Sequence, residues 1–288
     1  MKTIKILILG KSNVGKSSLI NFLINNHSAL VSNKLHATRI STSHSYKYKD
    51  YNIELVDTPG ASITTTNLLS QAMKSHASKH IMDADIIILL THPQRTYDYE
   101  LKIKDQIDEC NKNYFICVNK SDLQDSDKSK EIFCNKLGIN DLLMISLKDS
   151  LGIDKFFSVL DEYINNIDTF HDHKTNKKND LNIIQELIRE TVINRTNKEL
   201  PYESAVCITN YKKQNNSDII KADIIVSKSN HKKIIIGKNG DMIKTIGMKS
   251  REKIESYLNK KIYLSLFVVV KENWKNDANL LKDYGYIE

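Results

Sequence analysis

The sequence predicts an α/β domain with a mostly parallel, doubly wound sheet, followed by a smaller α+β domain. Three observations carry this prediction: short β-branched runs alternate with longer mixed segments up to residue 168, a polar segment interrupts the pattern at 169–180, and the order of elements changes behind it. A length of 288 residues is enough for two domains that each bury a core.

The first domain, residues 1–168, is predicted to contain six strands. Each candidate is a short run rich in β-branched or large apolar residues. The closely spaced pair within residues 46–56 favours an antiparallel hairpin at the edge of an otherwise parallel sheet with helices on both faces. The six runs are 4–9, 46–49, 53–56, 86–90, 114–118 and 143–145.

A polar segment at residues 169–180 separates the two domains. Its sequence, TFHDHKTNKKND, lacks apolar periodicity and is rich in Lys, Asn, Asp and His, which is typical of an exposed linker. His171 and His173 could bind a metal, but no third ligand accompanies them, so we interpret them as linker residues.

The second domain, residues 181–288, begins with a helix and ends with a strand. This order favours an α+β domain rather than a continuation of the first sheet. The predicted elements are a helix at 181–194, strands at 203–209 and 219–227, two helices that flank residues 237–240, and a strand at 262–270.

The composition is that of a globular protein inside the cell. Hydrophobic residues make up 40% and charged residues 27% of the chain, and no apolar run reaches the length of a transmembrane helix. The first strand begins at once, without the pattern of a signal peptide, so we expect a cytoplasmic protein. The four cysteines lack metal-ligand spacing and are expected to stay reduced.

The net charge of +7 is concentrated in the second domain. Residues 181–288 carry 19 Lys and Arg against 13 Asp and Glu, an excess of 6, whereas residues 1–180 carry 23 against 22. A basic domain joined to a nearly neutral one suggests a module that binds a polyanion, although a Lys-rich surface can also serve solubility alone.

A phosphate-binding loop follows the first predicted strand. Its pattern is Gly, four residues, Gly, Lys and Ser, and a helix is expected to begin near Ser17. Backbone N–H groups and the helix N-terminus would hold the β-phosphate, Lys16 would neutralise the β/γ oxygens, and Ser17 would bind Mg²⁺. The predicted nucleotide contacts in this segment are Gly10, Lys11, Ser12, Asn13, Val14, Gly15, Lys16, Ser17 and Ser18.

A second loop, directly after the strand at 114–118, is predicted to select guanine. Asp122 can accept hydrogen bonds from the two neighbouring donors of guanine, which adenine does not offer. Asn119 would tie this loop to the phosphate loop, and Lys120 would cover the base. Ser146 and Leu147, after the next strand, resemble a third guanine-contacting loop, so GTP is the expected nucleotide.

The segment that ends the strand at 53–56 resembles the magnesium and γ-phosphate sensor of GTPases. Asp57 would hold Mg²⁺ through water and the Gly60 amide would touch the γ-phosphate, with Thr58 and Pro59 between them. Thr38 resembles the threonine of the other switch, which binds the metal in the GTP state. Mg²⁺ would therefore involve Ser17, Thr38 and Asp57.

The position after Gly60 holds Ala61, where Ras-like GTPases carry the glutamine that orients the attacking water. Hydrolysis must therefore wait for a partner or use a monovalent cation. Asn13 resembles the asparagine of GTPases that use K⁺, although Ser12 replaces the proline usual before it. The expected catalytic group is Asn13, Lys16, Thr38 and Gly60.

The second domain contains a GxxG loop between two predicted helices. This arrangement, with a strand behind it, resembles a type II KH domain, whose loop clamps the backbone of about four nucleotides of single-stranded RNA. Glycines allow close approach of phosphates and Lys238 supplies charge. The predicted RNA contacts are Ile236, Gly237, Lys238, Asn239, Gly240 and Lys244.

The GTPase loops in this order, the string IIIGKNGDMIKTIG, the string VKENWKND and the terminal YGY resemble the Era family of bacterial ribosome-assembly GTPases over nearly the whole chain. The resemblance implies a P-loop GTPase domain followed by a type II KH domain, GTP/GDP with Mg²⁺, and the 3′ end of 16S rRNA in the small ribosomal subunit as partner. It also implies peripheral association with the inner membrane. We expect a monomer that does not bind DNA. Residues 61–78 are richer in Thr and Ser than the family's second switch.

Two other readings remain open from the sequence. One is a GTPase of another class whose KH-like module acts on a different RNA, as in tRNA modification or translation. The other is a binding protein with an inactive GTPase half, which is disfavoured because Lys16, Ser17, Asp57 and Asp122 are all present.

Overall fold

The computed structural model describes residues 2–24, 41–58, 67–93, 98–123, 126–167, 179–196 and 200–287. Thr38, Pro59, Gly60 and Ala61 lie outside these ranges, as does most of the predicted linker. In chain order the described elements are β1 (Lys2–Leu9), α1 (Lys16–Ile24), β2 (Thr42–Tyr48), β3 (Tyr51–Asp57), α2 (Leu68–Asp83), β4 (Ile86–Thr91), α3 (Asp98–Glu109), β5 (Tyr114–Val118), η1 (Ser121–Leu123), α4 (Ser126–Leu137), β6 (Leu143–Met144), α5 (Ile153–Asn165), α6 (Asn179–Arg195), α7 (Leu200–Glu203), β7 (Ser204–Lys212), β8 (Asp218–Val226), α8 (Ser229–Ile236), η2 (Lys238–Gly240), α9 (Asp241–Leu258), β9 (Ile262–Val270), η3 (Trp274–Asn276) and α10 (Ala278–Asp283).

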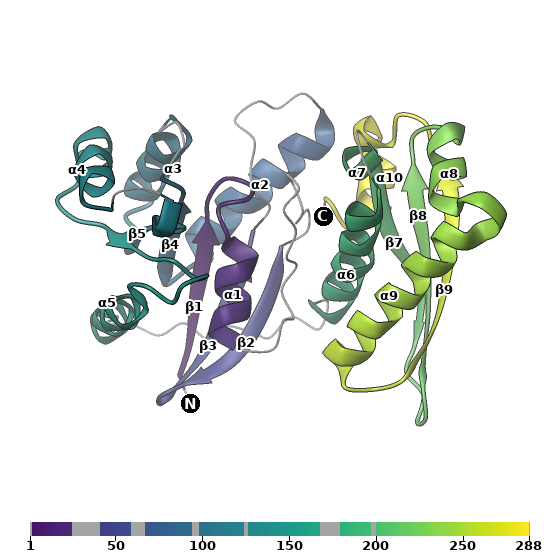
Figure 1. The fold of residues 1–288 in the computed structure, drawn as a ribbon, viewed down its shortest axis with the longest axis horizontal. Helices are drawn as coiled ribbons and strands as arrows, with labels where there is room; N and C mark the ends of the chain where they lie inside the picture. Colours follow the sequence, from purple (N-terminus) through teal and green to yellow (C-terminus); the bar gives the residue numbers. More distant parts are fainter. Residues whose placement is uncertain are drawn as a thin grey trace. The chain divides into compact units, whose positions relative to one another are not determined.

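The chain divides into two compact units, and the first contains a six-stranded sheet with the order β2-β3-β1-β4-β5-β6 (Figure 1). β1 pairs in parallel with β3 and β4, and β5 pairs in parallel with β4 and β6. β2 alone is antiparallel, paired with β3 at the edge. The predicted mostly parallel sheet with an antiparallel edge hairpin is therefore confirmed.

Alternating side chains of β1 explain why helices cover both faces of this sheet. Ile4, Ile6 and Ile8 pack into a core with α1 and α5, while Leu7 and Leu9 pack into a second core with α2, α3 and α4. The central strand β4 is buried over its whole length, as expected for a parallel strand between two helical layers.

β2 is longer than predicted because it begins with polar residues. Thr42 and His44 are buried, and the Thr42 hydroxyl lies 3.2 Å from Nε2 of His44. Burial lowers the pKa of His44 to about 4, so the ring is neutral near pH 7. The hydrogen bond between them thus lets two polar side chains occupy buried strand positions. A search for apolar runs does not detect such positions as part of a strand.

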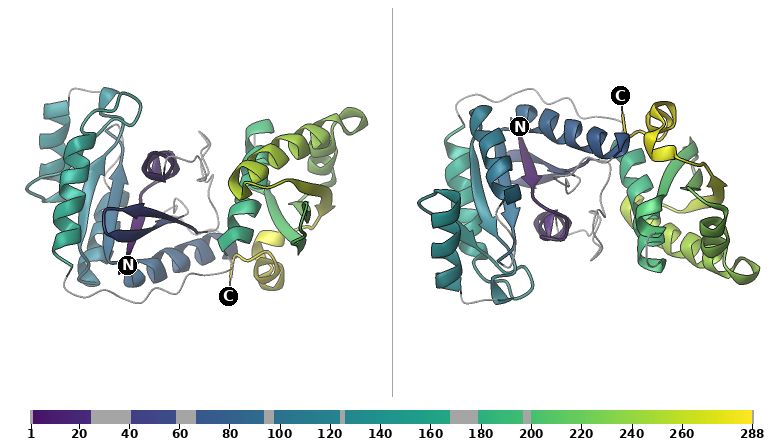
Figure 2. Two further views of the ribbon diagram at one scale, coloured as in Figure 1. Left: turned by 90° about the horizontal axis from the view of Figure 1, so that it is seen from below. Right: turned by 90° about the horizontal axis from the view of Figure 1, so that it is seen from above.

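The second unit holds a three-stranded sheet with the order β7-β8-β9, in which β8 is antiparallel to β7 and parallel to β9. Helices α6, α8 and α9 pack on one face of this sheet through a core that includes Ile188, Ile235 and Ile254 (Figure 2). Apart from the short helix α7 between α6 and β7, the order helix, strand, strand, helix, GxxG loop, helix, strand matches the predicted α+β domain.

The predicted linker ended at residue 180, but α6 already begins at Asn179. An acidic residue in a first turn stabilises a helix because the N-terminal N–H groups carry partial positive charge. Asp180 does this and also accepts a hydrogen bond from the Tyr257 hydroxyl at 3.0 Å. The polar composition of the last two linker residues therefore marks a helix start.

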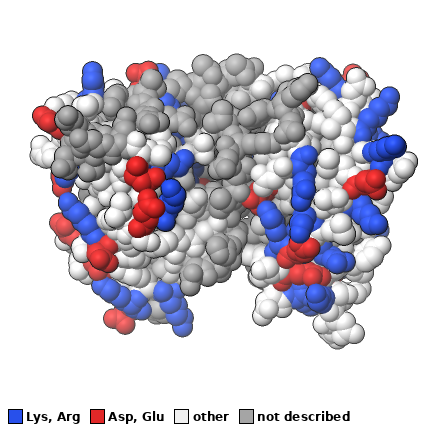
Figure 3. Space-filling view, in the orientation of Figure 1, with Lys and Arg blue, Asp and Glu red and all other residues white. Residues whose placement is uncertain are grey.

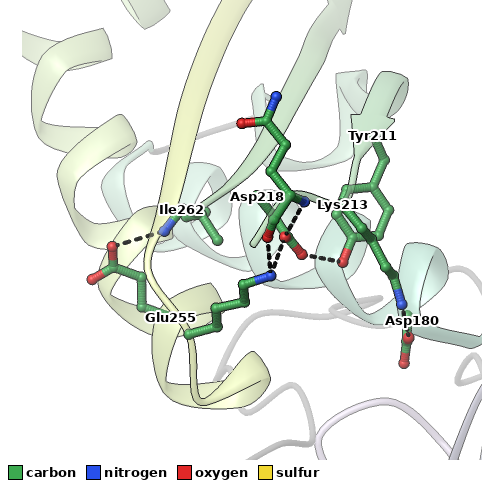
Figure 4. Close-up of polar contacts among 8 residues, drawn as sticks. Asp180, Tyr211, Lys213, Asp218, Glu255 and Ile262 are labelled. Atoms are coloured by element: carbon green, nitrogen blue, oxygen red, sulfur yellow. Dashed lines mark hydrogen bonds and ion pairs between the residues drawn. The ribbon is translucent and has the colours of Figure 1, made fainter. Parts of the chain in front are cut away.

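A polar cluster joins the β7–β8 hairpin to the end of α9 (Figure 4). The carboxylate of Asp218, 3% exposed, accepts hydrogen bonds from the Tyr211 hydroxyl at 3.0 Å, the backbone N–H of Gln214 at 3.1 Å and the Lys260 ammonium at 2.6 Å. Because a buried carboxylate must be fully hydrogen-bonded, these contacts fix the turn between the two strands.

The C-terminal segment closes one end of the outer face of this sheet, and only part of it was anticipated. Trp274 is fully buried and packs with Tyr284 and Tyr286, at ring-centroid distances of 6.2 and 6.1 Å. Ala205 and Ile225 from the outer face of the sheet join the same cluster. The strings VKENWKND and YGY thus have a packing role. Among the described helices of the chain, none is long and apolar enough to cross a membrane.

Candidate functional site

The phosphate loop runs from the end of β1 to the start of α1. Two glycines make its path possible: a Cβ on Gly10 would lie 2.2 Å from the Leu90 carbonyl oxygen, and one on Gly15 would lie 2.3 Å from Nδ2 of Asn119. Gly15 (φ 106°) and Asn13 (φ 66°) also take left-handed backbone conformations. The loop is therefore a compact backbone cradle at the carboxyl edge of the sheet, where doubly wound folds bind ligands.

Lys16 lies inside this cradle. Its ammonium donates to the carbonyl oxygens of Gly10 at 2.9 Å and Lys11 at 3.0 Å, and only 7% of the residue is exposed. Burial lowers the pKa of Lys16 to about 8, while the nearby Asp57 carboxylate opposes the shift. A buried cation held by two backbone oxygens is positioned for an incoming anion such as a phosphate.

Asp57 and Ser17 bring two oxygen ligands together. β3 lies beside β1 with Asp57 in register with Ile8, and the Ser17 hydroxyl donates to Oδ2 of Asp57 at 2.8 Å. Thr58 is anchored by its own hydroxyl, which donates to the Ile8 carbonyl at 2.9 Å. A hydroxyl and a carboxylate beside a phosphate cradle are the hard oxygen donors that Mg²⁺ prefers, so these residues fit that ion.

Asn119 connects the loop after β5 to the phosphate loop. Its side-chain amide donates to the carbonyl of Val14 at 2.9 Å, and its oxygen accepts from the Leu147 amide at 3.4 Å. Lys120, with a positive φ of 62°, donates from its ammonium to the Asn13 carbonyl at 3.1 Å. Three loops that are far apart in the sequence are thereby fixed to one another, as predicted for Asn119.

Asp122 stands at the exposed end of this cluster. The Ser146 hydroxyl donates to its Oδ1 at 2.7 Å, and this hydrogen bond is the main reason why the pKa of Asp122 is lowered. Ser146 is fully buried. The sequence predicted Ser146 as part of a base-contacting loop, and the structure adds that its hydroxyl orients the carboxylate.

Tyr99 on α3 is a neighbour of the phosphate loop that the sequence did not reveal. Lys11 lies over its ring with the ammonium 5.8 Å from the centroid. Burial and the Glu100 carboxylate raise the pKa of Tyr99, and a hydrogen bond with the Gly10 backbone opposes the shift. Periodicity of α3 could have marked Tyr99 as buried, but not as a support for the loop.

The structure brings the predicted residues from 10 to 18 together with Asp57, Thr58, Asn119, Lys120, Asp122, Ser146 and Leu147 at the edge of one sheet. The predicted contacts Thr38, Pro59 and Gly60 lie outside the described residues.

The GxxG loop of the second unit joins α8 to α9. Gly237 (φ 75°), Asn239 (φ 54°) and Gly240 (φ 82°) all have positive φ, which lets the chain reverse within one turn. A Cβ on Gly237 would lie 2.6 Å from Cβ of Met242, whereas one on Gly240 would meet nothing within 4 Å. Gly237 is therefore required for packing, and Gly240 leaves open space beside the exposed Lys238.

A groove of ≈ 350 Å³ lies between α9 and β9, and its lining begins at Ile243, three positions after this loop. Of the residues that line this groove, only Lys244 was predicted from the sequence as an RNA contact. The other lining residues come from a helix and an edge strand that share no motif, so the sequence did not indicate them. On the face shown in Figure 3, basic side chains spread over the second unit among acidic ones. The groove is lined by Ile243, Lys244, Gly247, Met248, Arg251, Tyr263, Leu264 and Leu266.

Comparison with known proteins places this arrangement in a family. Residues 5–120 match the family described as 50S ribosome-binding GTPase, and residues 199–275 match the KH domain. GTPase Era of Fusobacterium nucleatum is 35% identical over 297 residues, covering 100% of both chains. The chain belongs to the Era GTPase family. GTPase Era of Lactobacillus helveticus is 32% identical and covers 98% of this chain and 95% of its own.

Two solved Era structures have the same fold. An Aquifex aeolicus Era variant bound to GDP and AlF4⁻ matches with a TM-score of 0.85 and 28% identity, and Era bound to MgGDPNP and nucleotides 1506–1542 of 16S ribosomal RNA matches with 0.85 and 27%. Both matches cover 100% of each chain. The predicted Era family, P-loop GTPase domain and KH domain are confirmed.

Proposed function

We propose that this Era-family chain hydrolyses GTP as a switch and binds single-stranded RNA at the 3′ end of 16S rRNA, and thereby assists assembly of the small ribosomal subunit. The observation that carries the proposal is the pair of hydrogen bonds at Asn119, whose side chain donates to the Val14 carbonyl of the phosphate loop and accepts from the Leu147 N–H beside Ser146. Together with Asp122, they form one binding site for a phosphate chain and a base with two adjacent donors.

Each nucleotide-contacting residue receives a role from its position. Lys16 would neutralise the β/γ-phosphates. Ser17, and Asp57 through water, would hold Mg²⁺, which would stabilise charge on the phosphate oxygens. Asp122 accepts from guanine. We extend the proposal to Thr38 as a metal ligand in the GTP state.

The attacking water needs a replacement for the glutamine that Ala61 does not provide. We propose that K⁺ held near Asn13 assists hydrolysis instead, with Gly60 as the γ-phosphate sensor. The left-handed backbone of Asn13 directs its carbonyl toward Lys120. A monovalent cation near Asn13 would offset charge that develops between the β- and γ-phosphates.

The RNA partner is the segment bound by the related structure, nucleotides 1506–1542 of 16S rRNA. The GxxG loop would clamp its backbone and the adjacent groove would accept unpaired bases. We also propose that the protein is a monomer in the cytoplasm with peripheral association at the inner membrane, and that it does not bind DNA. Residues 169–178, which precede α6, are proposed as the linker between the GTPase and KH domains.

GTP turnover measured first in K⁺ and then in Na⁺ tests the enzymatic part. We expect hydrolysis of GTP and not ATP, with stimulation by K⁺ that Asn13→Ala removes while GDP binding persists. Asp122→Asn should shift preference toward xanthosine nucleotides, because an amide at this position presents a donor to guanine's donors. Equal affinity for ATP and GTP would refute the guanine assignment, and equal turnover in both salts would refute the K⁺ mechanism.

Footprinting on small ribosomal subunits and on tRNA tests the RNA partner. Protection of the 16S 3′ end supports the proposal. Protection of tRNA alone would favour the second reading, a GTPase of another class that acts on tRNA.

A further inference from the structure

The outer face of the three-stranded sheet is only partly covered. Side chains alternate across a strand, so the residues of β9 that do not face α9 point to this outer face. At one end of it the Trp274 cluster covers Ile225. At the other end Tyr263 and Phe267 are 63% and 56% exposed, although Phe is among the residue types that are most often buried.

The two rings are separated by polar groups. Tyr263 and Phe267 are four residues apart on one strand, hence about 13 Å apart on the same face. Ser265 lies between them, and the exposed Lys221 of β8 is in register beside Ser265. A protein interface would place a continuous apolar core here. Two isolated rings with an ammonium between them fit an extended polyanion with flat groups.

β9 joins this face to the groove. It is an edge strand of the sheet. Tyr263 lines the groove, and along β9 its position alternates with those of the side chains that pack against the helices. A chain that leaves the groove therefore meets the outer face by passing around a single strand.

We propose that single-stranded RNA leaving the groove passes around β9 and stacks unpaired bases on Tyr263 and Phe267, with Lys221 neutralising a phosphate between them. This inference rests on the proposed RNA-binding function. Stacking on aromatic side chains is the common way in which proteins hold unpaired bases, and it works for every base because each has a π-face.

The spacing of the rings selects an extended strand. Successive stacked bases in a helix are about 3.4 Å apart, so bases about 13 Å apart cannot belong to one stacked step. A duplex would therefore not fit this face. Asp223 is in register beside Phe267 and half-buried, so its carboxylate can accept a hydrogen bond from an amino group of the base on that ring. We expect a base with an exocyclic amino group at that position, rather than uracil.

The experiment uses the full chain and RNAs trimmed from both ends of nucleotides 1506–1542 of 16S rRNA. Trimming on the wild type defines the shortest RNA that binds, which should be about four nucleotides long. The second probe is the same RNA extended by about four nucleotides at each end in turn, with 2-aminopurine placed at each added position, because stacking on a ring quenches its fluorescence.

Phe267→Ala is the decisive variant because Phe267 does not line the groove. We expect it to weaken binding of the extended RNA by about tenfold, within the range for loss of one base stack, and to leave the shortest RNA unaffected. Fluorescence at one added position should rise in this variant. Phe267→Leu keeps apolar area without the flat ring and should behave likewise. Met82→Ala, at a 60% exposed apolar residue outside the RNA unit, should change neither RNA.

The outcomes distinguish failure of the proposed RNA-binding function from failure of the stacking surface. If the wild type binds neither RNA, the proposed RNA-binding function fails. If it binds both with equal affinity, or if Phe267→Ala binds the extended RNA as the wild type does, the stacking surface is refuted while the groove stands. In that case the exposed rings serve another partner, such as a protein.

Discussion

Nucleotide binding should be coupled to protonation of Lys16. In the nucleotide-free protein, burial lowers the pKa of this ammonium to about 8 even though Asp57 opposes the shift. A bound phosphate chain would place several negative charges beside the ammonium and raise its pKa again. Below pH 8 the lysine is already charged before binding. Above pH 8 it must take up a proton when the nucleotide binds, so affinity should fall as pH rises.

The size of the effect follows from the pKa of the free protein. At pH 8.5 about three quarters of the Lys16 side chains would be neutral before binding, and about that fraction of a proton should be taken up per nucleotide bound. Between pH 7 and pH 9 the affinity for GDP should fall about tenfold if the pKa in the complex lies above this range.

Isothermal titration calorimetry at pH 8.5 in two buffers with different heats of ionisation measures the proton uptake directly. Lys16→Arg is the matched control because a guanidinium stays charged throughout this range. A pH dependence of GDP affinity that arises from titration of the nucleotide itself should remain in that variant. If the wild type takes up no proton at pH 8.5, or binds GDP equally well at pH 7 and pH 9, the argument that Lys16 is buried and easily neutralised is wrong.

Three further variants test other contacts. Asn119→Ala leaves the buried Val14 carbonyl without its donor, which costs about 1–3 kcal/mol, so the Kd for GDP should rise about tenfold and Tm should fall; an unchanged Kd by fluorescence titration would contradict this. Asp218→Asn should lower the free energy of unfolding by about 1–3 kcal/mol. Burial alone would raise the pKa of Asp218, but the hydrogen bonds from Lys260 and other donors outweigh it, so the pKa is lowered. The greater stability of the wild type should therefore be present above pH 4 and disappear as pH falls below it, which denaturant unfolding measures. Gly240→Asp should abolish RNA binding in a filter assay, whereas Gly240→Asn, which keeps the shape and tolerates a positive φ without the charge, should retain most of it.

Much of the fold could be predicted because its elements have strong local signals. The parallel strands are short apolar runs separated by helices, and the run at 114–118 coincides with β5 at both ends. Glycines and Lys16 located the phosphate loop since few residue types can form a cradle of N–H groups. The beginning of β2 at Thr42 was missed because its buried polar residues pair with each other, which a pattern of hydrophobicity does not record.

Contacts between distant segments were harder to predict than motifs. Tyr99 supports the phosphate loop from a helix about ninety positions away, and no motif marks a residue whose role is to lie beneath another loop. The groove has the same origin: α9 supplies one wall and the edge strand β9 the other. The motif alone indicated only that Gly237 binds RNA, whereas the structure shows that a side chain there would clash with Met242. A substitution of Gly237 therefore tests folding as well as RNA binding.

The two units are proposed to hold phosphates in physically different ways, and we expect ionic strength to affect the two kinds of binding differently. Lys16 is buried and fixed by two carbonyl oxygens, and charges out of contact with solvent are weakly screened by salt. Lys238 and Lys244 are exposed beside an open glycine loop. Each phosphate neutralised there releases counterions, so log K should fall by about 0.7 per contact for each unit of log salt. We therefore expect RNA affinity to drop steeply between low and high salt while GDP affinity changes little. Lys238→Ala should flatten the RNA slope by somewhat less than one unit without altering base preference, since a lysine on a phosphate reads no sequence. RNA binding that is as insensitive to salt as GDP binding would show that the basic residues around the loop do not contact the strand.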